Sequence, residues 1–467
     1  MQGKDKSDGP PDGLYGARRW WAVLSITLGT ILTTISGSMV NIALPTLSRD
    51  LGVTDSAAVL VVTVYQLILM MTLLPFSALG DRLGHRAIYQ WGQVIFVVAT
   101  LLSFFAESLP FLLVVRAFQA IGAAGAMSVS AALIRQVYPA AKLGRGLSLN
   151  TVMAAGFATL APTVGGMILS VARWPWLFAA LVPFGVLSVF AGRKALPDPV
   201  IHETRFDVAG AVLCAATFGL AVVGLESGLH GDSPVISAAL VLLGIGIGVV
   251  FVRRELGQER PMLPVDLLEQ RDIALPTVAL FAGYLSSTII MLVLPFTLQQ
   301  GYGFSPAAAG AVLAPWPLIT IFVAPVAGTL SDRYPAGLLG GIGMVIGLGG
   351  LLSLTLLPAS PSHFDLVWRI LVCGFGFGMF YSPNARQIVA AAPQARTAAA
   401  GALTTTVRGA SQTLGATAVA GLLAAGFGIG PAAAYIAAAL AAIAGVCCFL
   451  VLRAPTRHIA AEDLPEL

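Results

Sequence analysis

The feature that most constrains this chain is a succession of long, uninterrupted apolar runs. About 20 apolar residues are needed for a helix to cross the hydrocarbon core of a bilayer. Backbone groups inside lipid must form their hydrogen bonds within the segment, so these runs are expected to be helical. Only 10% of the 467 residues are charged, whereas a soluble domain carries about 25%. The sequence therefore predicts an all-α integral membrane protein and excludes a soluble fold.

Fourteen runs are expected to be membrane spans, and two charged connections that contain proline separate them into groups of six, two and six. The expected spans are 20–44, 57–79, 88–106, 109–134, 147–170, 176–192, 208–228, 235–252, 274–298, 307–330, 338–357, 366–390, 398–424 and 432–452. The expected organisation is a disordered cytoplasmic tail (1–19), an N-terminal six-helix half (20–192), a cytoplasmic linker (193–207), an inserted helix pair (208–252), a second cytoplasmic linker (253–273), a C-terminal six-helix half (274–452) and a cytoplasmic tail (453–467).

The placement of Lys and Arg predicts the orientation. Residues such as Arg82, Arg86 and Arg333 concentrate in the connections on one side, whereas the connections on the other side carry Arg49 and Arg173. Because cytoplasmic connections are enriched in Lys and Arg, both termini are expected in the cytoplasm. We expect a monomeric, multi-pass protein of the bacterial inner (plasma) membrane, with the lipid bilayer as its surroundings. The net charge of +4 reflects these connections rather than a nucleic-acid-binding surface.

An internal repeat relates the two six-helix halves. Asp332-Arg333, after the tenth span, follows Asp81-Arg82, after the second, by 251 residues (332 − 81). The Leu-Pro pair at 294–295 follows that at 44–45 by 250 residues. Parallel halves of this kind place a substrate site between them near the midplane and move by rocking against one another. The repeat therefore predicts a transporter that works by alternating access.

Six short motifs strengthen this interpretation. They are residues 77–86 (SALGDRLGHR), 115–122 (VRAFQAIG), 161–166 (APTVGG), 40–45 (VNIALP), 174–178 (WPWLF) and 206–210 (FDVAG). In this order and spacing the chain resembles the major facilitator superfamily, in its fourteen-helix drug:proton antiporter branch. The resemblance implies a 6+2+6 arrangement and a multidrug-type exporter of small amphipathic molecules, driven by proton antiport. Ser77 and Ala161 stand where the motifs usually carry Gly.

The turn between the second and third spans is expected to act in gating. Gly84 permits a tight turn. Asp81 is expected to cap a helix start or to pair with a neighbouring Arg, and so to hold the halves closed on the cytoplasmic side. The alternative is that Arg82 and Arg86 only set the topology. We favour the latch, because Asp81 adds nothing to topology.

The fifth span contains Pro162, Gly165 and Gly166. Proline bends a helix, and small residues let a neighbouring helix approach closely. Ordinary packing of small residues is the immediate expectation, and a pliable seam between helices is its consequence.

Two arginines, Arg116 and Arg408, fall inside expected spans, where a charge is costly and usually functional. The alternative for each is a structural Arg bonded to backbone carbonyls. Other polar residues in the spans are candidates for lining the substrate cavity, although some are expected to bond helices together instead. These candidates are Asn41, Tyr65, Gln66, Gln119, Asn150, Tyr381, Asn384 and Gln412.

Ser36 marks the departure from the family with the largest consequence, because the branch usually has Asp there. Ser36 and Arg116 are expected about 12 Å and 10 Å below the same surface, so Arg116 lacks a carboxylate partner. Carbonyls, water or the ligand must then compensate its charge. We therefore expect a positive cavity that accepts anionic or neutral substrates. Proton coupling is in question, because Glu226 is the acid nearest to a span interior.

Two alternatives remain open at this point. One is an uncoupled facilitator or an importer of a specific metabolite. The other is an intramembrane enzyme, which needs clustered catalytic groups such as a His-Glu-x-x-His zinc motif or a Ser with a His. The spans contain neither pattern, so we expect no enzyme, no metal and no cofactor. The expected partners are a small-molecule substrate and protons.

Overall fold

The computed structural model describes residues 13–139, 142–197, 207–229, 233–258, 263–427 and 430–452. Residues 1–12 and 453–467 of the predicted tails lie outside these ranges, whereas residues 16–19, predicted as part of the disordered tail, belong to the first helix. The regular secondary structure of the described residues is helical throughout. The first group of helices is α1 (Gly16–Asp50), α2 (Asp55–Leu83), α3 (His85–Leu102), α4 (Leu109–Val137), α5 (Leu143–Val171), α6 (Trp176–Ala179) and α7 (Val182–Ala195). Then follow α8 (Val208–Leu229) and α9 (Pro234–Glu255).

The last group is α10 (Arg271–Phe296), α11 (Pro306–Leu313), α12 (Pro315–Leu330), α13 (Ala336–Thr355), α14 (His363–Ala391), α15 (Thr397–Ala424) and α16 (Ala432–Val451). Four short helical turns, η1 (Ser103–Phe105), η3 (Val265–Glu269), η4 (Thr297–Gly301) and η5 (Gln394–Arg396), complete the described structure. Thirteen spans of the described chain are long and apolar enough to cross a membrane. With α15, which is 28 residues long, they confirm the predicted all-α membrane fold.

Two predicted spans are each divided into two helices. The span predicted at 176–192 consists of α6 and α7, and the one predicted at 307–330 consists of α11 and α12. A proline lies in the first turn of α7 and of α12. Because proline has no backbone N–H, it is tolerated at a helix start and interrupts a continuous helix. The helix α1 is instead longer than the predicted span, because it continues through Pro45 to Asp50 and does not end at 44.

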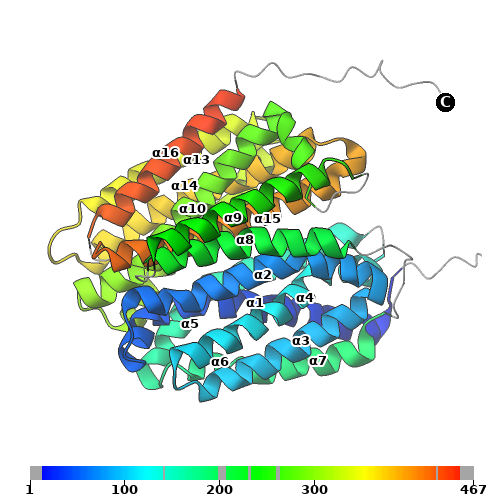
Figure 1. Ribbon diagram of the computed structural model, residues 1–467, viewed down its shortest axis with the longest axis horizontal. Coiled ribbons are helices and arrows are strands. Elements are labelled where there is room, and N and C mark those ends of the chain that lie inside the picture. Colours follow the sequence, from blue (N-terminus) through cyan, green and yellow to red (C-terminus); the bar gives the residue numbers. More distant parts are fainter. Residues whose placement is uncertain are drawn as a thin grey trace, which may run out of the picture.

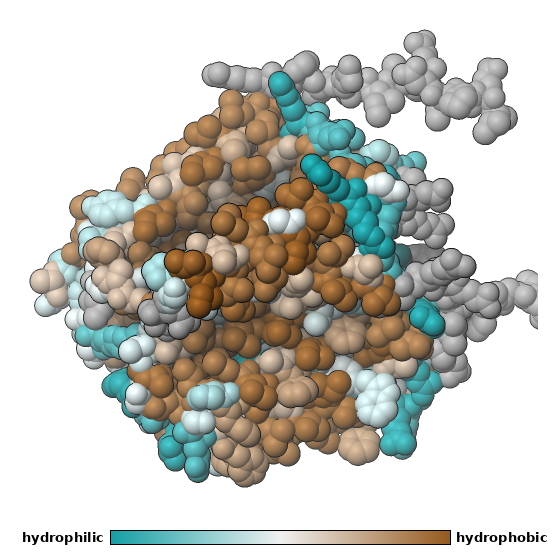
Figure 2. Space-filling model, viewed as in Figure 1, coloured by the Kyte–Doolittle hydropathy of each residue, from teal (hydrophilic) through white to brown (hydrophobic). Residues whose placement is uncertain are grey.

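The helices form two bundles, α1–α7 and α10–α16, with the α8–α9 hairpin lying along the front between them (Figure 1). The hairpin packs on α2 of one bundle and on α15 of the other. Its own helices meet at glycines, since a Cβ at Gly224 or Gly244 would lie 2.8 Å from a backbone nitrogen of the partner helix. Hydrophobic residues cover the middle of this face, and hydrophilic ones gather toward its sides (Figure 2). This distribution is that of a protein surrounded by lipid.

We call the end of the bundle that carries Arg82, Arg86 and Arg333 the basic end, and the end that carries Arg49 and Arg173 the opposite end. At the basic end, Asp207, just before α8, accepts two hydrogen bonds from Arg254 in the last turn of α9. These bonds, with others from neighbouring groups, lower the pKa of Asp207 to about 2. Asp207 is therefore ionised at any physiological pH, and its ion pair with Arg254 joins the two helices of the hairpin at the basic end.

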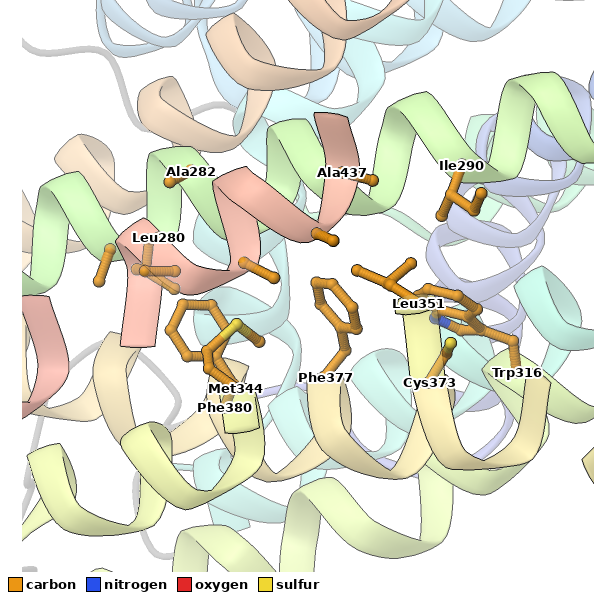
Figure 3. Close-up of a cluster of buried hydrophobic side chains, with 14 of the residues drawn as sticks. Leu280, Ala282, Ile290, Trp316, Met344, Leu351, Cys373, Phe377, Phe380 and Ala437 are labelled. Atoms are coloured by element: carbon orange, nitrogen blue, oxygen red, sulfur yellow. The ribbon is translucent and has the colours of Figure 1, made fainter. Parts of the chain in front are cut away.

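Each bundle has its own apolar core. In the C-terminal bundle Trp316, Phe377, Phe380 and Met344 pack against one another from three helices (Figure 3). Neither core is confined to its own bundle, because Ile42 of α1 belongs to the C-terminal core and the N-terminal core also takes in residues of the other bundle. Phe296 of α10 and residues 416, 419 and 420 of α15 pack into it, against α1 and α2. The two bundles therefore share apolar packing at one level.

Candidate functional site

A cavity of about 530 Å³ lies between the two bundles. Residues of α1, α2, α4 and α5 line it on one side, and residues of α10, α11, α12, α14 and α15 on the other. Six of the polar residues singled out in the sequence line it: Asn41, Tyr65, Gln66, Tyr381, Arg408 and Gln412. The position between halves is the one that the repeat predicts.

Four other candidates lie outside this lining. Ser36 and Gln119 are buried at 1% and 0% exposure, and both contact Arg116. Asn384 is also fully buried and donates a hydrogen bond to the carbonyl oxygen of Phe380. Asn150 lies on α5, away from the residues that line the cavity. Ser36, Gln119 and Asn384 therefore belong to helix packing in this conformation.

Arg116 is fully buried, and neutral groups compensate its charge. Its Nε donates to the carbonyl oxygen of Val61 at 3.2 Å. Its Nη1 donates to Ser36 Oγ at 3.2 Å and to Gln119 Oε1 at 2.5 Å. The guanidinium also lies 4.2 Å from the ring centroid of Tyr65, a distance typical of cation–π attraction. Of the compensating groups considered from the sequence, a backbone carbonyl is present, and the side-chain oxygens of Ser36 and Gln119 are acceptors that the sequence analysis did not consider.

Tyr65 connects this buried network to the cavity. Its ring contacts Arg116 on one side, while the residue is itself part of the cavity lining. The predicted proximity of Ser36 and Arg116 is confirmed by their contact, although α1 is longer than expected. With α1 ending at Asp50, Ser36 lies 14 residues from that end rather than 8, which corresponds to about 21 Å.

Arg408 is the cation that faces the cavity directly. It is exposed there, and within the described residues it takes part in none of the hydrogen bonds or ion pairs of the structure. The lining residues include no Asp, Glu or His. The described cavity wall therefore carries a positive charge without a facing carboxylate.

The C-terminal wall contains an aromatic pair that the sequence reading missed. Tyr284 stacks on Tyr381 with ring centroids 4.4 Å apart and an interplanar angle of 14°. The signal for Tyr284 was present in the sequence. Residues 284, 287, 288, 291 and 295 share one face of α10, because residues three and four apart lie above one another on a helix, and all five line the cavity.

At the opposite end the two bundles touch through backbone. A Cβ on Gly166 of α5 would lie 2.5 Å from the carbonyl oxygen of Pro306 of α11. A Cβ on Gly310 would overlap the carbonyl oxygen of Pro162. We call these four residues the glycine–proline contact. The predicted close approach at this motif is confirmed, and Gly165 adds to it, because its Cα faces Met39 and Ile42 of α1.

Hydrogen bonds reinforce the junction of the bundles at that end. Gln299 Nε2 donates to the carbonyl oxygen of Ile42 at 2.9 Å. Ser56 Oγ donates to the carbonyl oxygen of Ala420 at 2.8 Å. The bundles are thus closed against each other on the opposite-end side of the cavity.

The turn between α2 and α3 lies at the basic end. Gly84 has a φ of 92°, a conformation that glycine adopts without steric cost, so the predicted tight turn is confirmed. Asp81 does not cap a helix start, because α2 continues to Leu83. Its Oδ1 lies 3.0 Å from His85 Nε2, and His85 Nδ1 lies 3.2 Å from Gln136 Nε2.

The repeat gives the corresponding turn of the C-terminal bundle a different partner. Asp332, which corresponds to Asp81, pairs with Arg386 of α14. Arg386 also donates to Ser331 Oγ at 2.7 Å. Arg386 was not singled out in the sequence, because it lies near the end of a span where a basic residue is ordinary. Arg86 instead donates to the carbonyl oxygen of Arg193 at 2.8 Å.

Comparison with known proteins identifies the family. The model of the major facilitator superfamily matches residues 26–416 and 277–464. The chain belongs to the major facilitator superfamily. It is 38% identical to the uncharacterized transporter YebQ of Escherichia coli K12 over 438 residues, 93% of this chain and 96% of the relative. It is 30% identical to the riboflavin transporter RibZ of Clostridioides difficile, over 85% of this chain and 87% of RibZ.

A third relative, the methyl viologen resistance protein SmvA of Salmonella typhimurium, is 27% identical over 83% of this chain and 79% of its own. Solved structures of the superfamily share the fold. A POT family transporter in complex with 5-aminolevulinic acid superposes with a TM-score of 0.70 at 16% identity, over 95% of this chain and 97% of that chain. This protein is therefore a multi-pass membrane transporter of the superfamily, and its relatives are transporters rather than enzymes.

A first prediction concerns the two turns of this superfamily member at the basic end. Asp81→Asn and Asp332→Asn should each lower transport about two- to fivefold, since exposed ion pairs contribute modestly and switching pairs bias the populations of states. Membrane insertion should be unchanged. Transport in proteoliposomes and protein yield are the measurements. Glu107→Gln, an exposed acid at the opposite end, is the control. Unchanged transport by well-expressed Asp81→Asn protein would contradict the latch.

Proposed function

We propose that the protein exports small amphipathic molecules, neutral or anionic, across the bacterial inner membrane by alternating access. The observation that carries the proposal is the cavity between the bundles, with Arg408 in its wall and no carboxylate among its lining residues. A cation at membrane depth attracts anions and repels cations, because charges interact strongly where water is scarce.

The state of the cavity supports alternating access. The glycine–proline contact and the two hydrogen bonds from Gln299 and Ser56 join the bundles at the opposite end. The positive-inside rule assigns the basic end to the cytoplasm, so we infer that both termini are cytoplasmic and that substrate enters from that side. Rocking the bundles about the cavity would then open the opposite end.

Two relatives are named for compounds that differ in charge. RibZ is named for riboflavin, a planar molecule without a fixed positive charge, and SmvA is named for resistance to methyl viologen, a double cation. The positive cavity wall of this chain favours a substrate without fixed positive charge. Export rather than uptake rests on the resemblance to the drug:proton antiporter branch.

Proton antiport is the driving reaction that we propose, and it is tested together with substrate charge. Inside-out vesicles that contain the protein should accumulate a neutral or anionic amphiphile, and an imposed inward-acidic gradient should increase the rate about tenfold or more, since an exchanger of this kind couples the two flows. The control is the same vesicle with the gradient collapsed. Efflux of quaternary ammonium dyes with anions ignored would overturn the proposed substrate class.

One observation favours the alternative of an uncoupled facilitator. The lining residues of the cavity offer no side chain that loses and regains a proton near neutral pH. If transport proceeds at equal rates with and without the gradient, and in both directions, the protein is a facilitator.

A further inference from the structure

The two walls of the cavity differ in chemistry. The wall formed by α1 and α2 presents hydroxyl and amide groups from Thr33, Thr34, Ser38, Asn41 and Gln66. The facing wall presents most of the aromatic rings and the cation, from Tyr284, Trp316, Tyr381 and Arg408, beside the hydroxyl and amide groups of Ser287, Thr288, Thr320 and Gln412. A molecule that bridges the cavity therefore meets hydrogen-bonding groups on both sides, and it meets the stacked aromatic rings and the cation on the C-terminal side.

The aromatic part of the C-terminal wall is rigid. The hydroxyl of Tyr381 donates to Ser287 Oγ at 2.7 Å, which fixes its ring in the stack with Tyr284. Behind Tyr381 lie Phe377 and Phe380, with ring centroids 5.8 Å and 5.4 Å away. Phe377 in turn packs against Trp316, at 5.1 Å (Figure 3). A ligand ring that stacks on this surface loses little affinity to ordering it, because the surface is already in place.

Arg408 lies beside this aromatic surface. The guanidinium is within electrostatic range of the Tyr284 hydroxyl, and both residues belong to the cavity lining. Gln412, four residues further along α15, lies on the same helix face and also lines the cavity. A guanidinium offers a planar fork of donors that matches a carboxylate. A positive charge at this depth without a facing acid is unfavourable until an anion compensates it.

We propose that this C-terminal wall binds a planar aromatic anion, whose ring stacks on the Tyr284–Tyr381 pair while its carboxylate or other anionic group binds Arg408. Polar substituents on the far edge of the ring face the hydroxyl and amide groups of the N-terminal wall. The inference deepens the proposed function and rests on it, since it names the substrate class of the same cavity.

Stacking on the aromatic pair and the charge of Arg408 contribute to binding affinity in different ways, so they can be tested separately. A charged hydrogen bond is about twice as strong as a neutral one, so Arg408 governs the preference among ligands that differ only in charge. Stacking adds less, and it depends on aromaticity rather than on charge. Four matched probes separate these effects: 2-naphthoate, 2-naphthamide, 2-naphthylmethylammonium and decahydro-2-naphthoate.

The experiment measures equilibrium binding to the purified full-length protein in nanodiscs, by isothermal titration calorimetry and without any gradient. Wild-type protein should bind 2-naphthoate about tenfold more tightly than 2-naphthamide, because the charged hydrogen bonds are lost in the amide. The ammonium probe should bind most weakly. Decahydro-2-naphthoate should bind about fivefold more weakly than 2-naphthoate, because its saturated rings do not stack.

Two variants assign the contributions to residues. Arg408→Gln should remove the advantage of naphthoate over naphthamide and leave naphthamide binding unchanged. Tyr284→Leu should weaken binding of 2-naphthoate and 2-naphthamide about equally and leave binding of decahydro-2-naphthoate unchanged. The controls are Arg173→Gln and Tyr435→Leu, an exposed cation and an exposed ring outside the cavity. Thermal unfolding of each variant shows that the fold is retained.

Three results would overturn the site. They are failure of every probe to bind wild-type protein, binding of the ammonium probe as tight as that of the carboxylate, and equal loss of naphthoate and naphthamide in Arg408→Gln. The transport assay distinguishes failure of the site from failure of the proposed function. Normal binding with no transport of any amphiphile would refute export and leave the site intact. Transport of non-aromatic anions without naphthoate binding would refute the site alone.

Discussion

Gly166→Ala should reduce transport about fivefold or more and leave the helices folded. The added Cβ would lie 2.5 Å from the carbonyl oxygen of Pro306 and 2.9 Å from the Cα of Ala307, so α5 and α11 must separate. Backbone on both sides leaves no flexible side chain to yield, and overpacking of this kind costs about 1–3 kcal/mol. At 1.4 kcal/mol for each factor of ten, the population of the closed opposite end falls about fivefold or more relative to the open one. Gly166→Leu should have the larger effect.

The same helix supplies a matched control. A Cβ at Gly156 meets nothing within 4 Å, so Gly156→Ala should leave transport unchanged and slightly stabilise α5. Opening of the opposite end is measured directly by labelling Ser38→Cys, in the cavity lining, with an impermeant maleimide added from that side. Labelling should be slow in the otherwise wild-type protein and fast with Gly166→Ala. Normal transport by Gly166→Leu would refute the assignment of this contact as a gate.

Ser36→Asp should change the substrate preference and the pH response of the transporter together. Ser36 Oγ lies 3.2 Å from Arg116 Nη1, so a carboxylate at this position meets the guanidinium directly. Arg116 Nη2 has no hydrogen-bond acceptor among the described residues and would gain one. The ion pair reduces the positive potential that reaches the cavity through Tyr65. We expect uptake of lipophilic cations into inside-out vesicles to rise about tenfold relative to matched anions, which is about 1.4 kcal/mol.

The new carboxylate is also a group that can take up a proton. Transport by Ser36→Asp should therefore depend more steeply on the imposed pH gradient than transport by wild type. Ser36→Asn has nearly the same shape without the charge, so it should keep the wild-type preference and pH response. An identical response of the Asp and Asn variants would show that Arg116 does not influence the cavity.

The helical fold was predictable because apolar runs of membrane length have one structural solution in lipid. The divisions within spans were not, because a proline in an apolar run either begins a new helix, as Pro315 does, or is absorbed, as Pro45 is. Packing around each proline decides between these outcomes, and the neighbouring residues in the sequence do not specify that packing. The contact of Ser36 with Arg116 could be inferred because the resemblance placed the first and fourth spans side by side and the helix rise put the two residues at similar depths.

The cavity lining was less predictable for a rotational reason. Successive residues of a helix differ by about 100° in direction, which follows from 3.6 residues per turn. A small error in the assumed rotation of α4 therefore assigns a packed residue to the cavity. Gln119 is such a residue, because its side chain contacts Arg116 and does not line the cavity. The stripe on α10 that contains Tyr284 was visible in the spacing alone, since all of its members share one face.

The glycine–proline contact also has a consequence for the entropy of the transport cycle. In the proposed alternating-access cycle, each turnover would close and reopen the junction of α5 and α11. Side chains such as Leu or Met lose about 0.5–2 kcal/mol of rotamer freedom each when they become buried, whereas Gly, Ala and Pro lose none. A junction built from Pro162, Gly166, Pro306, Ala307 and Gly310 has no rotamers to order on closing or to release on opening. In the proposed cycle the glycine–proline contact would therefore form and break without ordering side-chain rotamers of its own, so that the side-chain entropy cost of closing falls on flanking groups such as Gln299 and Ser56.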